Sequence, residues 1–375
     1  MNLSTKEQEK YARHLSLPEF DESHQLKLKN AKVLVVGAGG LSCASIPYLV
    51  AAGIGNLGII DHDRVSLSNL QRQVLYDESD IGKLKVEVMR SKLQKMNAAL
   101  KLETYPESLS NENARELFKQ YDLIIDGSDN FPTRYLCNDA AYLEGKALIY
   151  ASVYRFEGQL SVFNYPNKSS SVNYRDLQAE APEAELIPSC SEAGVLGIIP
   201  GIIGNLQALE AIKLITGIGE VLSGKLLVFD GLNHSFLKIE IPKNPKNPLS
   251  GASPTITELI DYQVFCGTNE TIDELDLKEA LDMAKEIDVE LIDVRNKEER
   301  ARFSLDSKWI ALDHLEEQVH QLAKEKTLIF YCETGNRSRK AIQVLKSKYG
   351  FRKLFNLKGG IQAYKFARLE SQNEQ

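Results

Sequence analysis

The sequence lacks the features that mark a secreted or membrane protein. Its N-terminal residues, MNLSTKEQEKYARHLSL, are polar and contain no apolar segment of the signal-peptide type. No run of residues approaches the roughly 20 consecutive apolar positions needed to cross a bilayer. The five cysteines are scattered and form no C-x-x-C pair, so we expect reduced thiols rather than a disulfide framework. These absences predict a cytoplasmic protein.

Positive charge is in deficit. The 45 Lys and Arg residues are outnumbered by 52 Asp and Glu residues, which gives a formal net charge of -7. Such a chain is repelled by polyanionic nucleic acid and by anionic membrane surfaces, so we expect neither as a partner. A protein partner, or a small anion bound by local basic residues, is compatible with the composition. At 375 residues, 43% of them hydrophobic, the chain is long enough for two domains with separate cores.

From residue 31 onward, short β-rich apolar runs alternate with helical patterns. This alternation predicts an α/β fold with a Rossmann-like, doubly wound and mostly parallel sheet. Strand patterns cover residues 31–37, 57–61, 121–130, 147–153 and 158–164, and the last alternates as an antiparallel strand does. Helices are predicted up to about residue 53, from residue 82 and at 200–217, with further strands at 225–230 and 236–242.

The composition changes after the last of these strands. The stretch from Pro242 to Pro254 is rich in proline, lysine, asparagine and serine, which is typical of a linker. A second α/β unit with its own strand and helix patterns follows. We therefore predict a first domain at 1–248, a linker at 249–268 and a smaller α/β domain at 269–375.

A glycine-rich turn follows the first predicted strand. Gly37, Gly39 and Gly40 stand between this strand and a helix, where glycines let the backbone approach a phosphate at the positive end of the helix. Ser42 takes the place of the third glycine in a G-x-G-x-x-G motif. Asp61 ends the next strand, where a carboxylate can accept hydrogen bonds from ribose hydroxyls. To this point the pattern fits an NAD-dependent dehydrogenase equally well.

Polar and cationic residues downstream favour a triphosphate over a nicotinamide. They are Asp63, Asn69, Arg72 and Lys85, with Asp129 and Asn130 at the end of a later strand. Attack of a carboxylate on an α-phosphate joins two anions, so cations and a metal must neutralise the approach and the pyrophosphate leaving group. Arg72 and Lys85 supply the cations, and Asp129 supplies an oxygen ligand for Mg²⁺. Each of the three, taken alone, also fits an ordinary surface charge.

Five motifs together resemble the MoeB/ThiF adenylyltransferases, which are relatives of the ubiquitin-activating enzymes. They are LSNLQRQ at 67–73, GKLKVE at 82–87, DGSDN at 126–130, RFEGQ at 155–159 and CSEAGVLG at 190–197. The resemblance spans residues 5–248, in order and with compatible spacing. It implies ATP contacts from Gly39, Asp61, Asn69, Arg72 and Lys85, with Mg²⁺ bound at Asp129.

The resemblance also implies partners. Arg13, in the motif YARH, resembles the arginine that family dimers insert into the nucleotide site of the neighbouring subunit, so we expect a homodimer. The implied substrate is a small ubiquitin-like sulfur-carrier protein of the MoaD/ThiS type, whose C-terminal Gly-Gly tail is adenylated with release of pyrophosphate. Molybdopterin, thiamin and thiolated-tRNA synthesis all use such carriers, and the sequence leaves the pathway open.

One departure from the family concerns metal. Members usually carry two C-x-x-C pairs that bind a structural zinc, but the matching segments here read NYRD at 173–176 and NPLS at 247–250. Tetrahedral thiolate ligation is impossible in segments that contain no cysteine. We therefore expect no structural zinc, while the nucleotide-binding residues are unaffected.

A cysteine loop in the second domain points to sulfur chemistry. The segment CETGNRS at 332–338 follows a predicted strand and begins a helix, so its backbone N–H groups can surround one anionic sulfur. With Arg337 they would stabilise a persulfide on Cys332. The loop, with LIDVRNKEE before it and FNLKGGIQAY after it, resembles a rhodanese active loop; a cysteine-dependent phosphatase, whose loop is one residue longer, ranks second. Glu333 would repel thiosulfate, which favours a persulfide-donating protein as the sulfur source.

Cys190 lies in a segment, 167–195, whose Ser, Pro and Glu residues interrupt the strand and helix patterns and suggest a mobile functional loop. It matches the position from which some family members attack the adenylate or form a disulfide-linked intermediate. An idle loop cysteine is nearly as consistent, because the persulfide on Cys332 could attack the adenylate directly.

The leading hypothesis is an ATP-dependent adenylyltransferase joined to a sulfurtransferase, a fusion that keeps the persulfide near a hydrolysable adenylate. One alternative is an NAD-dependent oxidoreductase with a redox-sensing rhodanese appendage, which predicts NADH binding and no pyrophosphate chemistry. Another is a non-catalytic carrier-binding module. The presence of Arg72, Lys85 and Asp129 argues against this last alternative.

Overall fold

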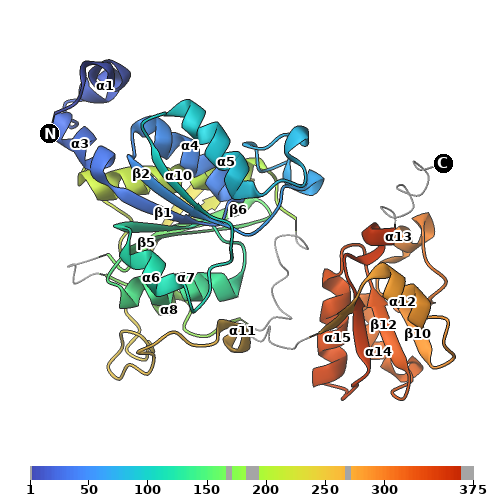
Figure 1. Ribbon diagram of the computed structural model, residues 1–375. Helices are drawn as coiled ribbons and strands as arrows, with labels where there is room; N and C mark the ends of the chain where they lie inside the picture. The colour runs from blue at the N-terminus through green and yellow to red at the C-terminus, as the bar shows by residue number, and fades with distance from the viewer. Residues whose placement is uncertain (1, 166–170, 183–193, 267–271, 365–375) are drawn as a thin grey trace. The chain divides into compact units, whose positions relative to one another are not determined.

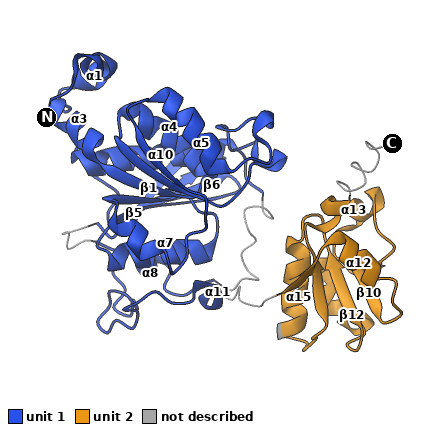
Figure 2. Ribbon diagram, in the orientation of Figure 1, with its two compact units in different colours: residues 1–268 blue, residues 269–375 orange. Residues whose placement is uncertain are grey.

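The computed structural model describes residues 2–165, 171–182, 194–266 and 272–364. The chain divides into two compact units, residues 1–268 and residues 269–375 (Figure 2). Both units are α/β, as predicted, and each has its own sheet and its own buried apolar clusters.

Unit 1 is built on an eight-stranded sheet with the order β3-β2-β1-β4-β5-β6-β7-β8 (Figure 1). The strands are β1 Lys32–Val36, β2 Asn56–Ile60, β3 Lys101–Tyr105, β4 Leu123–Asp126, β5 Ala147–Tyr154, β6 Glu157–Phe163, β7 Lys225–Asp230 and β8 Ser235–Glu240. Strands β1 to β5 pair in parallel, and β6, β7 and β8 add antiparallel pairs. The strand order reverses between β1 and β4, which is where α/β sheets of this kind bind ligands.

Helices cover both faces of this sheet. They are α1 Thr5–Lys10, α2 Ala12–Leu15, α3 Glu22–Asn30, α4 Gly40–Ala52, α5 Lys85–Met96, α6 Ala114–Lys119, α7 Phe131–Leu143, α8 Tyr174–Leu177, α10 Ile198–Thr216 and α11 Tyr262–Phe265, with 3-10 turns η1 Leu67–Asn69 and η2 Glu78–Asp80. One core cluster joins the sheet to α4, α5 and α10, and a second joins the other face to α6 and α7. The apolar alternation of the strands thus buries both faces of the sheet.

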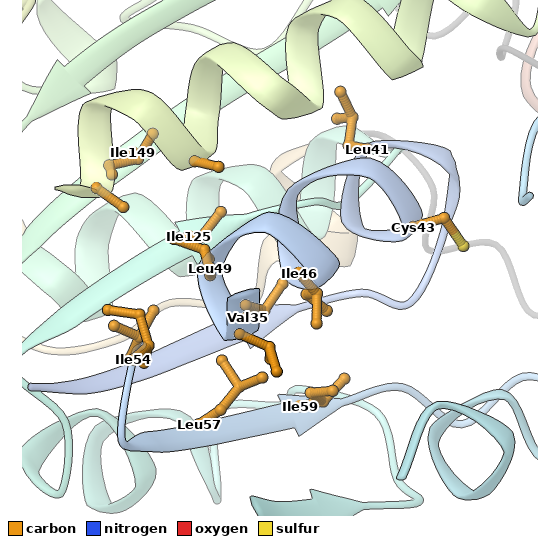
Figure 3. Close-up of a cluster of buried hydrophobic side chains, with 14 of the residues drawn as sticks. Val35, Leu41, Cys43, Ile46, Leu49, Ile54, Leu57, Ile59, Ile125 and Ile149 are labelled. Carbon is orange, nitrogen blue, oxygen red and sulfur yellow. The ribbon is translucent and has the colours of Figure 1, made fainter. Parts of the chain in front are cut away.

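The core under α4 shows why the chain places a small-residue helix there. Leu41, Ile46 and Leu49 of α4 pack on Val35 of β1 and its neighbours (Figure 3). A Cβ atom added to Gly204 of α10 would lie 2.2 Å from the backbone oxygen of Leu41, so only glycine permits α10 to pack this closely on α4.

Among the described helices, α10 is long and apolar enough to pass a length-and-composition test for a membrane span. It packs instead along α4 and β5, and Ile199 and Ile203 are buried in the core of unit 1. Two of its polar residues make hydrogen bonds inside the fold: Gln207 Nε2 donates to the Asp126 carbonyl (2.7 Å), and Glu210 Oε2 accepts from the Leu222 N–H (2.9 Å). The apolar composition of α10 is therefore that of a core helix.

Some local structure differs from the sequence prediction. The polar N-terminal segment forms two short helices, α1 and α2, which are separated at Tyr11. Strand β3 was not predicted, because its alternating pattern is short and only Leu102 is fully buried. Helix α5 starts at Lys85 rather than Gly82, because Gly82 has a φ of +85°, outside the helical region.

Residues that follow β8 pack on unit 1. Leu249, Tyr262 and Cys266 are buried, and the latter two contribute to the core cluster beneath α7. The side chain of Tyr262 donates a hydrogen bond to Asp139 Oδ2 (2.9 Å). Residues leading into and including short helix α11 are thus attached to unit 1 by the buried side chains of Leu249, Tyr262 and Cys266.

Unit 2 contains a five-stranded, wholly parallel sheet with the order β11-β10-β12-β13-β9. Its elements are β9 Asp273–Leu275, α12 Leu277–Met283, β10 Val289–Asp293, α13 Lys297–Arg302, β11 Lys308–Trp309, α14 Leu315–Gln318, β12 Thr327–Tyr331, α15 Asn336–Ser347 and β13 Leu354–Leu357, with 3-10 turns η3 Leu312–His314 and η4 Val319–Gln321. Central strand β12 is almost entirely buried. The cysteine loop begins directly after this strand.

Candidate active sites

A pocket lies at the carboxyl ends of β1, β2 and β4, at the point where the strand order reverses. Nine residues predicted from the sequence line it: Gly37, Gly39, Gly40, Asp61, Asp63, Arg72, Lys85, Asp129 and Asn130. Two predicted residues, Asn69 and Arg13, do not line it. Residues separated by more than 90 positions therefore meet at one edge of the sheet.

The glycine turn has the geometry of an anion site. Gly37 has a φ of +91°, and a Cβ there would lie 2.9 Å from the Gly127 backbone oxygen, so this position requires glycine. Gly39 is the N-cap of α4, and a Cβ there would lie 3.9 Å from Gln73 Nε2, the nearest described atom. The N-terminus of α4, the positive end of the helix dipole, thus lies at the pocket with room beside Gly39.

Asp61 orders the same turn. Its Oδ2 accepts from the Ala38 N–H (2.6 Å), and its Oδ1 accepts from the Asp63 N–H (2.7 Å). The carboxylate therefore ties the end of β2 to the glycine turn and remains partly exposed at the pocket, where its further lone pairs can accept from a ligand hydroxyl.

Two cations line the pocket. Lys85, the first residue of α5, is 4% exposed, and its Nζ lies 2.7 Å from Asp63 Oδ2. Arg72 is half-buried, and its Nη1 donates to the Ser68 carbonyl (3.0 Å). Within the described residues no carboxylate lies within salt-bridge distance of Arg72, so its charge faces the pocket unneutralised.

The other residues that were predicted to bind the nucleotide differ in their exposure and hydrogen bonds. Asn69 accepts from the Ser66 N–H (3.3 Å) and stabilises turn η1, which carries the chain toward Arg72. Arg13 is exposed on α2. Asn130 is the N-cap of α7 and accepts from the Thr133 N–H (3.0 Å). Asp129 is exposed at the pocket wall and makes no ion pair with any described residue.

Sequence reasoning missed two buried polar residues of the pocket. Arg134 is 7% exposed; its Nη2 donates to Ser152 Oγ (3.1 Å), and its guanidinium lies over the rings of Phe131 and Tyr150. Gln73 is 3% exposed, and its Oε1 has no hydrogen-bond partner among the described residues. Their only sequence signal was position: Gln73 is the last residue of LSNLQRQ, and Arg134 lies four residues after DGSDN. The local sequence does not show that either side chain is buried.

Metal-binding potential is concentrated at the end of β2. In the described part of the chain, the cluster of three side chains close enough to share a metal ion is Asp61, His62 and Asp63, with ligand atoms within 4.8 Å of one another. The prediction from the sequence was Asp129, across the same pocket. Lys85 already neutralises Asp63, which disfavours a cation at the Asp61 cluster.

The two segments that match the family's zinc-binding pairs lie together and share hydrogen bonds. Asn173 Nδ2 donates to Ser250 Oγ (2.8 Å), and Asn247 Nδ2 donates to Asn173 Oδ1 (3.0 Å). Asp176 Oδ1 accepts from the Asn244 N–H (2.9 Å). The side chains of Asn173, Asn247 and Ser250 thus join the two segments, and Asp176 binds the chain just before the second. These two amides, one hydroxyl and one carboxylate stand at the four positions where the family pattern has cysteines.

In unit 2, Cys332 follows β12 and is 1% exposed. The Gly335 N–H donates to its Sγ (3.1 Å), and Gly335 adopts a φ of +100° as the N-cap of α15. A Cβ at Gly360 would lie 2.5 Å from the Cys332 backbone oxygen, so the second glycine of FNLKGGIQAY lets the following chain pack against the loop. The Ile361 N–H donates to that same oxygen (2.8 Å).

Arg337 was expected to stabilise an anionic sulfur, but its strongest partner is a carboxylate. Its Nη1 and Nη2 donate to Glu299 Oε2 (2.7 Å) and Oε1 (2.5 Å) in a bidentate pair. This pairing raises the pKa of Arg337, to which Cys332 makes a smaller contribution, and lowers the pKa of Glu299. Glu333, next to Cys332, is in turn paired with Arg295 (3.3 Å).

The remaining cysteines fall into two groups. Burial raises the pKa of the Cys43 thiol to about 12 and of the Cys266 thiol to about 11, and it also raises that of Cys137. These three are therefore poor nucleophiles. Cys190 lies outside the described residues.

The pocket and the cysteine loop together define a two-domain enzyme: a Rossmann-type nucleotide-binding unit and a unit that holds a cysteine at a helix N-terminus. Two family models match the chain, ThiF family over residues 11–250 and Rhodanese-like domain over residues 276–367. The chain belongs to the ThiF family and carries a C-terminal rhodanese-like domain. It is an adenylyltransferase and sulfurtransferase, and enzymes of this family use ATP.

Relatives share this organisation over most of their length. The chain is 44% identical to the probable adenylyltransferase/sulfurtransferase MoeZ of Mycobacterium tuberculosis, over 96% of this chain and 94% of that protein. It is 38% identical to the adenylyltransferase and sulfurtransferase MOCS3 of Xenopus laevis (95% and 85%). It is 46% identical to the sulfur carrier protein adenylyltransferase of Thermus thermophilus, over 71% of this chain and 99% of that protein.

Solved structures support the fold of unit 1. The crystal structure of Escherichia coli MccB with ATP superposes with a TM-score of 0.53 and 23% identity, covering 60% of this chain and 68% of that one. At this level of identity the likeness establishes a shared fold.

Proposed function

We propose that this enzyme uses ATP to adenylate the C-terminal glycine of a small ubiquitin-like sulfur-carrier protein and then supplies sulfur to the activated carboxyl from Cys332. The observation that carries the proposal is that Arg72, Lys85 and Asp129 line one pocket with the glycine turn of α4. The name of the Thermus thermophilus relative, sulfur carrier protein adenylyltransferase, supports this choice of substrate.

In this proposal the pocket residues divide the work of adenylation. Gly37, Gly39 and Gly40 bind the phosphates, and Asp61 binds the ribose. Arg72 and Lys85 neutralise the triphosphate as the carrier carboxylate attacks the α-phosphate and pyrophosphate leaves. Asn69 and Asn130 order the loops around the nucleotide, and Asp63 holds Lys85 until the phosphates arrive.

Asp129 is proposed as the Mg²⁺ ligand. Its carboxylate is exposed, lines the pocket and is free of cationic partners among the described residues, which suits a hard cation bound together with phosphate oxygens. Bound Mg²⁺ would withdraw charge from the pyrophosphate. No structural zinc is proposed, because two amides, a hydroxyl and a carboxylate occupy the four positions in question.

Sulfur transfer is proposed to start from a persulfide on Cys332. Its outer sulfur attacks the acyl-adenylate carbonyl, forming a sulfur–carbon bond and displacing AMP. A second thiol then attacks the Cys332 sulfur of the resulting acyl disulfide, which breaks the S–S bond and releases the carrier thiocarboxylate. Cys190 is the candidate second thiol. Arg337, paired with Glu299, supports the loop that holds Cys332.

Several finer assignments accompany this proposal. We propose a homodimer in which Arg13 completes the neighbouring nucleotide site, and a persulfide-donating protein as the sulfur source. Residues 1–248 carry adenylation and 269–375 carry sulfur transfer, with 249–268 as the connection. The pathway served, molybdopterin, thiamin or tRNA thiolation, depends on which carrier is accepted, and the location proposed is the cytoplasm.

The test is ATP/pyrophosphate exchange with purified protein, Mg²⁺ and candidate carriers ending in Gly-Gly, compared with the same carriers lacking the last glycine. Exchange that requires the intact tail supports carboxyl adenylation and identifies the carrier. ATP binding without exchange for any carrier would favour a binding module, and reduction of bound NAD without exchange would favour the oxidoreductase alternative.

A further inference from the structure

A buried serine contacts the sulfur of the cysteine loop. Ser338, in the first turn of α15, is 0% exposed, and its Oγ lies 3.6 Å from Cys332 Sγ. The Gly335 N–H also donates to this sulfur (3.1 Å), and the Arg337 side chain interacts with it more weakly than with Glu299. Ser338 therefore touches the proposed reacting atom, although this last residue of CETGNRS was assigned no role of its own from the sequence.

The serine is held by a chain of side chains from three elements. Its Oγ donates to Asn356 Oδ1 of β13 (2.6 Å), and Asn356 Nδ2 donates to Glu274 Oε1 of β9 (2.7 Å). Glu274 Oε2 pairs with Arg339 Nη2 of α15 (2.8 Å). Asn356 is fully buried, and its amide is fixed because the carboxylate can only accept and so must face the NH₂ group.

The hydroxyl has one proton and three acceptors within reach. They are Asn356 Oδ1 (2.6 Å), the Gly335 carbonyl (3.0 Å) and Cys332 Sγ (3.6 Å). With a neutral thiol, the short bond keeps the proton toward Asn356, and the S–H group can donate to Ser338 Oγ. When the sulfur becomes a thiolate it can only accept, and rotation of one hydroxyl turns the proton to it.

Nearby full charges are largely compensated. Arg337 is paired with Glu299, and Arg295 is paired with Asp293 (2.8 Å) as well as with Glu333. A thiolate on Cys332 therefore gains less from these arginines than it would from free cations. Neutral hydrogen-bond donors to the sulfur therefore contribute a larger share of the stabilisation of the thiolate. Hydrogen bonds to a charged atom are stronger than those between neutral groups.

We propose that Ser338 is a catalytic residue of sulfur transfer, whose hydroxyl donates a hydrogen bond to the Cys332 thiolate and keeps its proton. This inference rests on the proposed role of Cys332. In loading, the thiolate attacks the outer sulfur of a donor such as thiosulfate; the new S–S bond forms as sulfite leaves. In unloading, a nucleophile such as cyanide attacks the outer sulfur; the S–S bond breaks and its electron pair stays on Cys332 Sγ. The Ser338 hydroxyl donates a hydrogen bond to the Cys332 thiolate in both steps, where this thiolate is first the attacking group and then the leaving group.

The test compares two substitutions of the same shape, Ser338→Thr and Ser338→Val, in the full-length chain. Thiosulfate:cyanide sulfur transfer is measured, and Cys332 alkylation by iodoacetamide is followed against pH by mass spectrometry of its peptide. We expect S338V to lower kcat about tenfold or more and to shift alkylation to higher pH, because a hydrogen bond to a charged group is lost. S338T should keep kcat within about threefold and leave the pH profile in place.

Equal rates and equal alkylation profiles for S338V and S338T would overturn the inference. If valine unfolds unit 2, Ser338→Ala, which removes only the oxygen, repeats the comparison with the same expected loss, and wild-type behaviour of S338A would equally overturn it. Cys332→Ser distinguishes failure of the proposed role of Cys332 from failure of the proposed role of Ser338. Activity that persists in C332S contradicts the role of Cys332. An inactive C332S together with a fully active S338V contradicts only the role of Ser338.

Discussion

Lys85 Nζ and Asp63 Oδ2 lie 2.7 Å apart, in a pair whose lysine is buried and whose carboxylate is exposed. The burial of the Lys85 stem in the first turn of α5 fixes the ammonium at the pocket wall. Asp63, which water also solvates, can give up this partner to a triphosphate at modest cost. Asp63 therefore holds the Lys85 ammonium, the cation of the proposed reaction, beside the proposed phosphate site until ATP binds.

The first prediction concerns this pair. Lys85→Met should lower carrier-dependent ATP/pyrophosphate exchange by about 100-fold or more, because one cation at the developing charge is lost. Asp63→Asn is the matched control, since it removes the resting partner and leaves the ammonium; its exchange rate should stay within about threefold of the wild type. A K85M enzyme that exchanges normally would remove Lys85 from the proposed mechanism.

The second prediction concerns how the free energy of unfolding changes with pH because of Asp126 and Arg134. Asp126 is fully buried, burial raises its pKa, and the charge of Arg134 opposes that rise. A carboxyl whose folded pKa lies above the unfolded value binds more protons when folded, so the free energy of unfolding falls as pH rises between the two values. In Arg134→Met the folded pKa is higher still, so this fall should extend to higher pH.

Urea unfolding of R134M at a series of pH values checks this. We expect R134M to be less stable than the wild type at every pH above the unfolded pKa of Asp126, with the difference growing toward neutral pH. Adding Asp126→Asn to R134M should abolish the additional pH dependence. A constant difference between R134M and wild type would mean that Arg134 acts through packing on Phe131 and Tyr150 rather than through its charge.

The third prediction concerns the hydrogen bonds that join residues 173–176 to 247–250. Asn247 Oδ1 accepts from the N–H groups of Leu249 and Ser250, and its Nδ2 donates to Asn173. Asn247→Ala should lower the free energy of unfolding of unit 1 by about 2–4 kcal/mol, because buried donors and an acceptor lose their partners. The urea midpoint is measured with and without a chelator. A chelator that lowers the wild-type midpoint would contradict a metal-free junction.

The sequence predicted which residues would meet at the carboxyl ends of the strands of unit 1. Gly37, Asp61 and Asp129 stand directly after strands or close to them, and parallel strands place such residues at one edge of the sheet. The antiparallel direction of β6 was also predicted correctly, because its apolar alternation is strong. These features depend on local pattern and on a general rule of sheet geometry.

What the sequence did not reveal depends on tertiary contacts. Glu299 pairs with Arg337 across 38 positions, and Asn356 reaches Ser338 across 18. A single sequence contains no periodicity that links such residues. Arg134 and Gln73 were missed for a related reason, since polar residues are usually exposed and nothing local marks these two as buried.

The last prediction tests how residues 249–266 are held on unit 1. Arg175 and Asp139 form a fully buried pair (2.7 Å), Tyr262 donates to the same carboxylate (2.9 Å), and the Arg175 guanidinium lies 4.6 Å from the ring centre of Phe265. Arg175→Met should destabilise unit 1 by about 3–5 kcal/mol, because it leaves Asp139 buried without its cation.

Tyr262→Phe removes only the hydrogen bond and should cost about 1 kcal/mol. We expect Y262F to speed amide hydrogen exchange over residues 262–266 more than over α4, and to leave ATP/pyrophosphate exchange unchanged, because the nucleotide pocket contains none of these residues. Uniformly faster exchange across unit 1 in Y262F would show that this contact supports the whole core instead of anchoring the segment that leads toward unit 2.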